Sequence, residues 1–147
     1  MPTQARECWI VVVDGSGAMI LENAGTEVAP DLRVIDRIET PKTDALPEPG
    51  RVTAQGVRAR PVEASDRVRL AETAMIAMLM TRLAFAVRQS RTTRLAIAAP
   101  PHLLEAIRTR LDDGLRARVA IMLPRTLTQH PLEKIVSVMQ SAMQRAA

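Results

Sequence analysis

Carboxylates are the first side chains in this chain that could carry out hydrolytic chemistry. Asp14 follows an apolar run, and Glu72 lies in a segment with helical spacing. A nuclease that uses two metal ions needs such carboxylates clustered around the phosphate that it cleaves. The apolar run Arg94–Ala98, however, is followed by Ala-Pro-Pro, so this run supplies no acid. Asp14 is better explained as the turn residue of a hairpin, and the sequence predicts neither a metal site nor a cofactor.

The two histidines, His102 and His130, are the next candidates, as a ligand pair or as an acid–base pair. Neither has an aspartate, glutamate or cysteine at metal-ligand spacing. His130 directly precedes Pro131, where a side chain can cap the last predicted helix. Thr126 and Thr128 are further candidate caps in the same segment. We therefore expect capping or surface roles for these side chains.

Arginine rather than lysine carries most of the positive charge of this chain, whose formal net charge is +4. Five arginines lie within or next to a stretch rich in proline and glycine: Arg51, Arg58, Arg60, Arg67 and Arg69. The guanidinium group suits bidentate contact with phosphate, so this arginine-rich segment could follow a nucleic-acid backbone. Trp9 and Phe85, the two aromatic residues, fall in predicted core elements, and we expect no base stacking. The alternative is a solvated segment with scattered charges.

Length and composition limit the classes of protein to which this chain can belong. At 147 residues the chain has the length of one domain, and its apolar content predicts a folded core. The one cysteine, Cys8, cannot form an intramolecular disulfide, which favours a reducing compartment. The longest apolar stretch, Ala74–Met80, is well short of the roughly 20 residues that span a bilayer, and the N-terminus does not resemble a signal peptide. We expect a cytoplasmic protein without a membrane partner.

The elements that would position these residues follow from hydrophobic periodicity. Strands are predicted at 7–13, 18–22, 32–39, 94–98 and 118–123, and helices from 66 onward, at 102–111 and after Pro131. Gly114 lies where a left-handed cap would end the second helix. A segment at about 40–65 holds four prolines and is expected to be a long flexible loop.

The order of these elements predicts the fold. Two hairpin connections give an antiparallel meander of three strands, and helix–strand–helix–strand–helix follows. The short crossover between the last two strands implies that they are parallel neighbours. The sequence thus predicts a single α/β domain over residues 1–147 with a five-stranded mixed sheet. This is the element order of ribonuclease-H-like folds.

Several motifs resemble those of a known family. Ala99-Pro100-Pro101, the strand at Arg116–Val119 and the turn at Leu127–Pro131 resemble the C-terminal half of the bacterial host-attachment protein family. Trp9–Asn23 resembles the opening hairpin of that family, and also that of the middle domain of archaeal and eukaryotic peptide-release factors. The resemblance implies the fold of that middle domain, and so agrees with the fold predicted from periodicity.

The resemblance also implies one candidate catalytic residue. Release-factor middle domains carry a Gly-Gly-Gln loop between the third strand and the first helix, which places a glutamine at the ester of peptidyl-tRNA. The corresponding segment here contains Gln55, but Thr53 and Ala54 precede it where two glycines would stand. Glycine allows positive φ and close backbone approach, which Thr and Ala do not allow cheaply. This departure argues against hydrolysis by Gln55.

Three functions are consistent with these observations. The leading hypothesis is a non-catalytic or weakly catalytic cytoplasmic factor that binds RNA or the translation apparatus, a ribosome or tRNA, through the arginine-rich segment. The enzyme alternative is hydrolysis of peptidyl-tRNA or RNA with Gln55. A protein–protein interaction module that forms a homodimer follows if an apolar face of the sheet or of a helix is left uncovered.

Overall fold

The computed structural model describes residues 8–23, 25, 29, 31–42, 64–89 and 94–146. Their elements, in chain order, are β1 (Cys8–Asp14), β2 (Gly17–Asn23), β3 (Leu32–Glu39), α1 (Ala64–Gln89), β4 (Arg94–Ala98), α2 (Pro101–Arg110), α3 (Asp113–Arg116), β5 (Val119–Leu123) and α4 (Leu132–Ala146). The order of strands and longer helices is the predicted one. The short helix α3 is an addition to it.

The five strands form one mixed sheet in the order β3-β2-β1-β4-β5. β1 pairs antiparallel with β2, and β2 antiparallel with β3. β4 runs parallel to β1, and β5 runs parallel to β4. The predicted five-stranded mixed sheet is therefore confirmed, with the two late strands parallel and β4 adjacent to β1. Val11, Val12 and Val13 are fully buried because β1 is the central strand and is covered on both faces.

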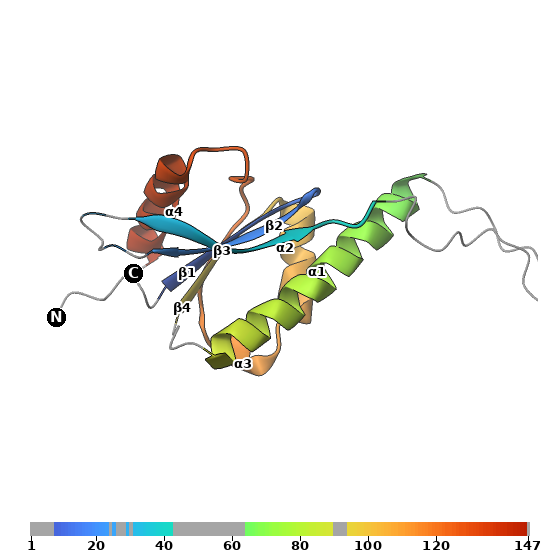
Figure 1. Ribbon diagram of the computed structural model, residues 1–147, viewed down its shortest axis with the longest axis horizontal. Helices are drawn as coiled ribbons and strands as arrows, with labels where there is room; N and C mark the ends of the chain where they lie inside the picture. The colour runs from blue at the N-terminus through green and yellow to red at the C-terminus, as the bar shows by residue number, and fades with distance from the viewer. Residues whose placement is uncertain are drawn as a thin grey trace, which may run out of the picture.

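Helices cover both faces of the sheet, as Figure 1 shows with α1 and α2 on one side and α4 on the other. Alternate residues of each strand point to opposite faces. Val11 and Val13 belong to the core cluster under α1 and α2, whereas Ile10 and Val12 belong to the cluster under α4. A strand with apolar residues at every position is thus accounted for by two cores, one on each face.

The turn between β1 and β2 requires glycine at one position. Gly17 has a φ of +159°, and a Cβ atom there would lie 2.3 Å from the carbonyl oxygen of Ile38 on β3. Any side chain would therefore push β3 away from the start of β2. This close approach brings the end of β3 next to the turn, where the backbone N–H of Thr40 donates to the carbonyl oxygen of Ser16 at 2.9 Å.

The prediction that Gly114 caps the second helix in a left-handed conformation was wrong. Helix α2 ends at Arg110, with Leu111 at its C-cap in an extended conformation. Gly114 lies inside α3 and does not have positive φ. The side chain of Asp112 caps α3 by accepting a hydrogen bond from the backbone N–H of Leu115 at 2.7 Å. The sequence Asp112-Asp113-Gly114 therefore begins a helix here and does not end one.

Helix α1 is buried on its inner side and exposed on its outer side. Its inner side is core, with Met75, Leu79 and Leu83 fully buried on the sheet. Phe85 was also expected in the core, but 60% of it is exposed. By length and composition alone, residues 66–89 could cross a membrane. Packing on the sheet accounts for the apolar residues of the inner side, and 33% of the apolar window is buried.

Candidate functional site

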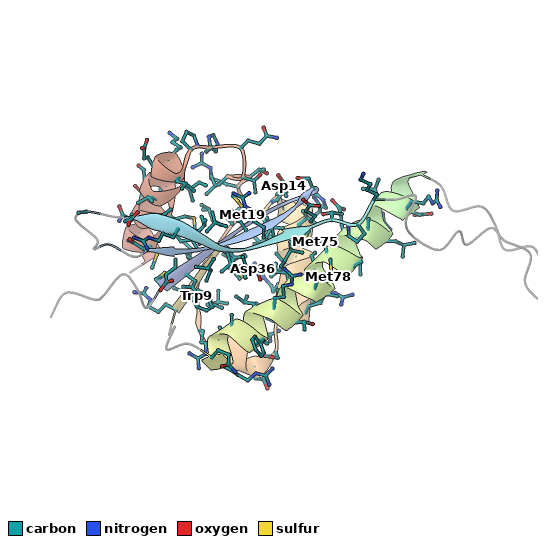
Figure 2. The ribbon with its side chains drawn as sticks, in the orientation of Figure 1. Trp9, Asp14, Met19, Asp36, Met75 and Met78 are labelled. Atoms are coloured by element: carbon teal, nitrogen blue, oxygen red, sulfur yellow. The ribbon has the colours of Figure 1, made fainter. Side chains whose placement is uncertain are left out.

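The carboxyl ends of the parallel strands β1 and β4 lie next to each other. We call the side of the sheet formed by these strand ends its carboxyl edge. In open α/β sheets, ligands bind outside this edge. The β1–β2 turn, the first turn of α2 and the loop between β5 and α4 all begin there. Figure 2 shows Asp14 at this end of β1 and Trp9 towards the opposite end. We define the edge cluster as Asp14, Glu72, His102 and Thr128, which hydrogen bonds and close contacts join in two pairs.

Asp14 organises the turn after β1. Its Oδ1 accepts hydrogen bonds from the backbone N–H of Ser16 at 2.7 Å, from the Ser16 hydroxyl at 2.6 Å and from the backbone N–H of Gly17 at 3.0 Å. Aspartate is favoured in turns for this reason, since its short side chain can satisfy the backbone amides that follow it. The predicted role of Asp14 as the turn residue of the hairpin is confirmed by these three bonds.

The second carboxylate oxygen of Asp14 reaches a different part of the chain. Oδ2 accepts a hydrogen bond from the hydroxyl of Thr128, in the loop between β5 and α4. Thr128 was expected to cap the last helix, and the structure instead shows it bound to Asp14. Burial acts to raise the pKa of Asp14, but hydrogen bonds from Ser16, Thr128 and Gly17 outweigh it and hold the pKa below its usual value. Asp14 is therefore a stable anion with both oxygens occupied, and is poorly suited to act as a general base.

Glu72 and His102 form the second pair of the edge cluster. Nε2 of His102 lies 3.4 Å from Oε2 of Glu72, which brings α1 and the first turn of α2 together. The Glu72 side chain is only 14% exposed, whereas that of His102 is 66% exposed. A Cβ atom on Gly15 would lie 3.1 Å from the same Glu72 oxygen, so the carboxylate also sits against the β1–β2 turn. Sequence reasoning found no acidic partner for His102 because this partner comes from a distant helix.

Histidine and carboxylate together raise the question of a metal ion. Within the part of the chain that the structure describes, no group of three or more His, Cys, Asp or Glu side chains could hold one. His130 is exposed on the loop before α4, and its backbone N–H donates to the carbonyl oxygen of Leu127 at 3.1 Å. The edge cluster is thus an arrangement of two acids, a histidine and a hydroxyl that ties four segments together.

Of the residues predicted to bind nucleic acid, two lie in the described part of the chain. Arg67 and Arg69 lie in the first turns of α1, where Arg69 is exposed and Arg67 is half-buried. Figure 1 shows this end of α1 extending past the sheet. The predicted catalytic Gln55 and the predicted binding residues Arg51, Arg58 and Arg60 lie outside the described residues, as does most of the loop predicted at about 40–65.

The residues on either side of that undescribed segment can be placed relative to the edge cluster. On one side, Thr40 follows β3 and is hydrogen-bonded through its backbone N–H to Ser16 in the β1–β2 turn. On the other side, α1 begins at Ala64, and its Glu72 lies against Gly15 of the same turn. Thr40 is thus tied to the β1–β2 turn, whereas α1 begins about two turns before its contact with that turn.

Comparison with known proteins adds three findings. The sequence model of bacterial archaeo-eukaryotic release factor family 12 matches residues 7–139. No curated protein matches the chain. Among solved structures, the chain is similar to Dom34 of S. cerevisiae, described as a translation termination-like factor involved in RNA quality control pathways and interacting with Hbs1. The TM-score is 0.48 at 11% identity, over 98% of this chain and 38% of that chain. The chain thus spans well under half the length of that relative.

Proposed function

This chain belongs to bacterial archaeo-eukaryotic release factor family 12, and from that membership we propose a factor that binds RNA or the translation apparatus through its arginine-rich segment. The family is release-factor-like and related to translation, as the resemblance of the opening hairpin implied. The finer proposal is that the protein is non-catalytic or weakly catalytic, that it acts in the cytoplasm, and that its partner is a ribosome or tRNA.

The position of Arg67 and Arg69 is the observation that supports this proposal, because they lie on the first turns of α1, which extend past the sheet (Figure 1). They continue along the sequence the positive charge of Arg51, Arg58 and Arg60. Arginine binds phosphate oxygens in pairs, so contact along an RNA backbone needs no base-specific groups.

Two features support a role without efficient hydrolysis. Thr53 and Ala54 occupy the positions where release factors have two glycines before the glutamine, and neither residue adopts positive φ cheaply. In the edge cluster, the carboxylate of Asp14 accepts four hydrogen bonds, which leaves it little basicity for activating a water molecule. We expect binding to be the activity of this protein, with Gln55 as the residue to test for any residual hydrolysis.

Sedimentation with ribosomes through a sucrose gradient tests the proposal. The wild-type protein should sediment with ribosomes at low salt and remain at the top of the gradient at high salt, because phosphate contacts release counterions. Arg67→Ala combined with Arg69→Ala should weaken this co-sedimentation. The matched control is Arg108→Ala with Arg110→Ala, which removes the same charge from the last turn of α2, at the opposite edge of the sheet.

Three outcomes would contradict the proposal. The first is a protein that stays free at every salt concentration. The second is an equal loss of co-sedimentation in the two double variants, which would mean that net charge alone determines binding. The third is rapid hydrolysis of peptidyl-tRNA that is abolished by Gln55→Ala, which would favour the enzyme alternative over the binding function.

A further inference from the structure

The outer side of helix α1 carries an apolar stripe that no other described element covers. We define the stripe as Leu70, Ala74, Ala77, Met78, Thr81 and Phe85. Its large residues are 48% exposed at Leu70, 37% at Met78 and 60% at Phe85. These positions recur every three to four residues and therefore lie on one side of a helix. Figure 1 shows this helix at the periphery of the molecule.

The composition of the stripe is unusual for a solvent-facing helix side. Ordinary surface helices place charged and polar residues away from the core, and scattered apolar residues there need no explanation. Here three exposed large apolar residues, with small residues between them, recur along one side of a helix that is 26 residues long, or about 39 Å. Exposed apolar surface of this kind marks an interaction site.

The spacing of the stripe is symmetric about its centre. Leu70 lies seven positions before Ala77, and Phe85 lies seven positions after Met78. Ala74 lies three positions before Ala77, and Thr81 lies three positions after Met78. A two-fold axis through the midpoint between Ala77 and Met78 would therefore place each residue of one helix opposite a residue of an identical, antiparallel helix.

We propose that this stripe is the interface of a homodimer in which two copies of α1 pack antiparallel. In a two-fold interface, the same patch is used by both subunits and must be complementary to itself. The symmetric spacing satisfies this requirement, with Leu70 facing the partner's Phe85 and Ala77 facing the partner's Met78. The small side chains of Ala74 and Ala77 allow the helix axes to approach closely at the centre, while the large residues close the two ends.

The charges at the two ends of α1 do not favour this arrangement. The same two-fold axis places Arg67 opposite the partner's Arg88 and Asp66 opposite the partner's Gln89. Antiparallel packing brings opposite ends of the helix dipoles together, which offsets part of the repulsion between the arginines. Apolar burial rather than charge therefore drives the association, and the dimer should persist in salt that abolishes RNA binding. None of the stripe residues is among the arginines proposed to bind RNA, and of those arginines Arg67 lies at the end of the interface.

Sedimentation equilibrium of the full chain tests the dimer. The wild type should have twice the monomer mass at micromolar concentration, at low and at high salt. Phe85→Glu should raise the dimer dissociation constant at least about tenfold, because it places a charge at two symmetry-related points of the interface. Leu132→Ser is the matched control, since Leu132 is 39% exposed on α4, on the other face of the sheet. This control should remain dimeric.

Cross-linking tests the register and disturbs the apolar surface less than Phe85→Glu does. In a Cys8→Ser background, Leu70→Cys and Phe85→Cys chains are mixed and treated with a short bis-maleimide. The antiparallel register predicts cross-links between the two different variants and few between identical chains. A monomeric wild type, a dimer insensitive to Phe85→Glu, or cross-links chiefly between two Leu70→Cys chains would each overturn the proposal.

Discussion

Thr128 donates a hydrogen bond to the carboxylate of Asp14, although the two residues are 114 positions apart in the chain. Asp14 ends β1 and Thr128 lies in the loop that leads to α4, so the bond joins the first strand to the last part of the fold. The other oxygen of the same carboxylate organises the β1–β2 turn. One side chain therefore positions the turn and the distant loop together.

Removing the Thr128 hydroxyl tests the contribution of this bond. Thr128→Val keeps the shape of the side chain and should lower the free energy of unfolding by roughly 1–2 kcal/mol, because a charged acceptor loses one of its donors. Urea denaturation at neutral pH measures the change. Thr126→Val is the control at an exposed position of the same loop and should change stability little. Equal effects of the two substitutions would mean that the bond to Asp14 adds no stability.

The pKa of Asp14 gives stability a dependence on pH with a definite sign. Because this pKa lies below the usual value of 3.8, the folded protein binds fewer protons than the unfolded chain in this range. The resulting stability is present above pH 3.8 and is lost as the pH falls through the folded-state pKa. Asp14→Asn should therefore be less stable than the wild type near pH 7, with a smaller difference near pH 3. Urea midpoints across this range measure the difference, and a constant difference would refute the assignment.

Two glycines should respond in opposite ways to alanine. Gly17→Ala should destabilise the protein strongly, by more than about 2 kcal/mol, because its Cβ would meet the backbone of β3 at 2.3 Å. Gly114→Ala should be neutral or stabilise by up to about 1 kcal/mol, since Gly114 is helical and the nearest atom to a Cβ there is 3.4 Å away. Thermal denaturation of both variants measures this. Strong destabilisation by Gly114→Ala would instead indicate that Gly114 has the left-handed conformation of a helix cap.

The arginine-rich segment should determine the salt dependence of RNA binding. Arg58→Ala with Arg60→Ala should weaken binding and flatten the plot of log affinity against log salt by roughly 1–2 units, at about 0.7 for each single-strand phosphate that an arginine no longer neutralises. The weakening should be similar for RNAs of different sequence. Gln55→Ala should bind as the wild type does. Unchanged binding in the double arginine variant would rule out these two residues as phosphate ligands.

The sheet could be predicted from the sequence because its central strands are short apolar runs bounded by turn signals. Ile10–Val13 and Leu95–Ala98 allow little other than strands buried on both faces. Periodicity could not show that the outer side of α1 is apolar yet exposed, since apolar residues on most sides are also typical of a helix packed on most of its circumference. Phe85 was misassigned for this reason.

The edge cluster was harder to predict than the sheet. The turn role of Asp14 depends on its neighbours in the chain, and the sequence was sufficient for it. The bond to Thr128 and the pairing of Glu72 with His102 depend on which loops meet at one edge of the sheet. A strand order alone gives that edge, but not the side-chain directions that bring a hydroxyl to a carboxylate.

The central position of β1 has a consequence for the order of folding. β1 pairs with β2 through a tight turn, so the meander can form early from contacts that are local in the chain. The other side of β1 can pair only with β4, which is synthesised after the whole of α1. A nascent chain released before β4 emerges would hold an open edge at the most apolar strand of the protein. Slow steps in refolding, and aggregation of truncated chains, should therefore trace to the docking of β4 rather than to the hairpin.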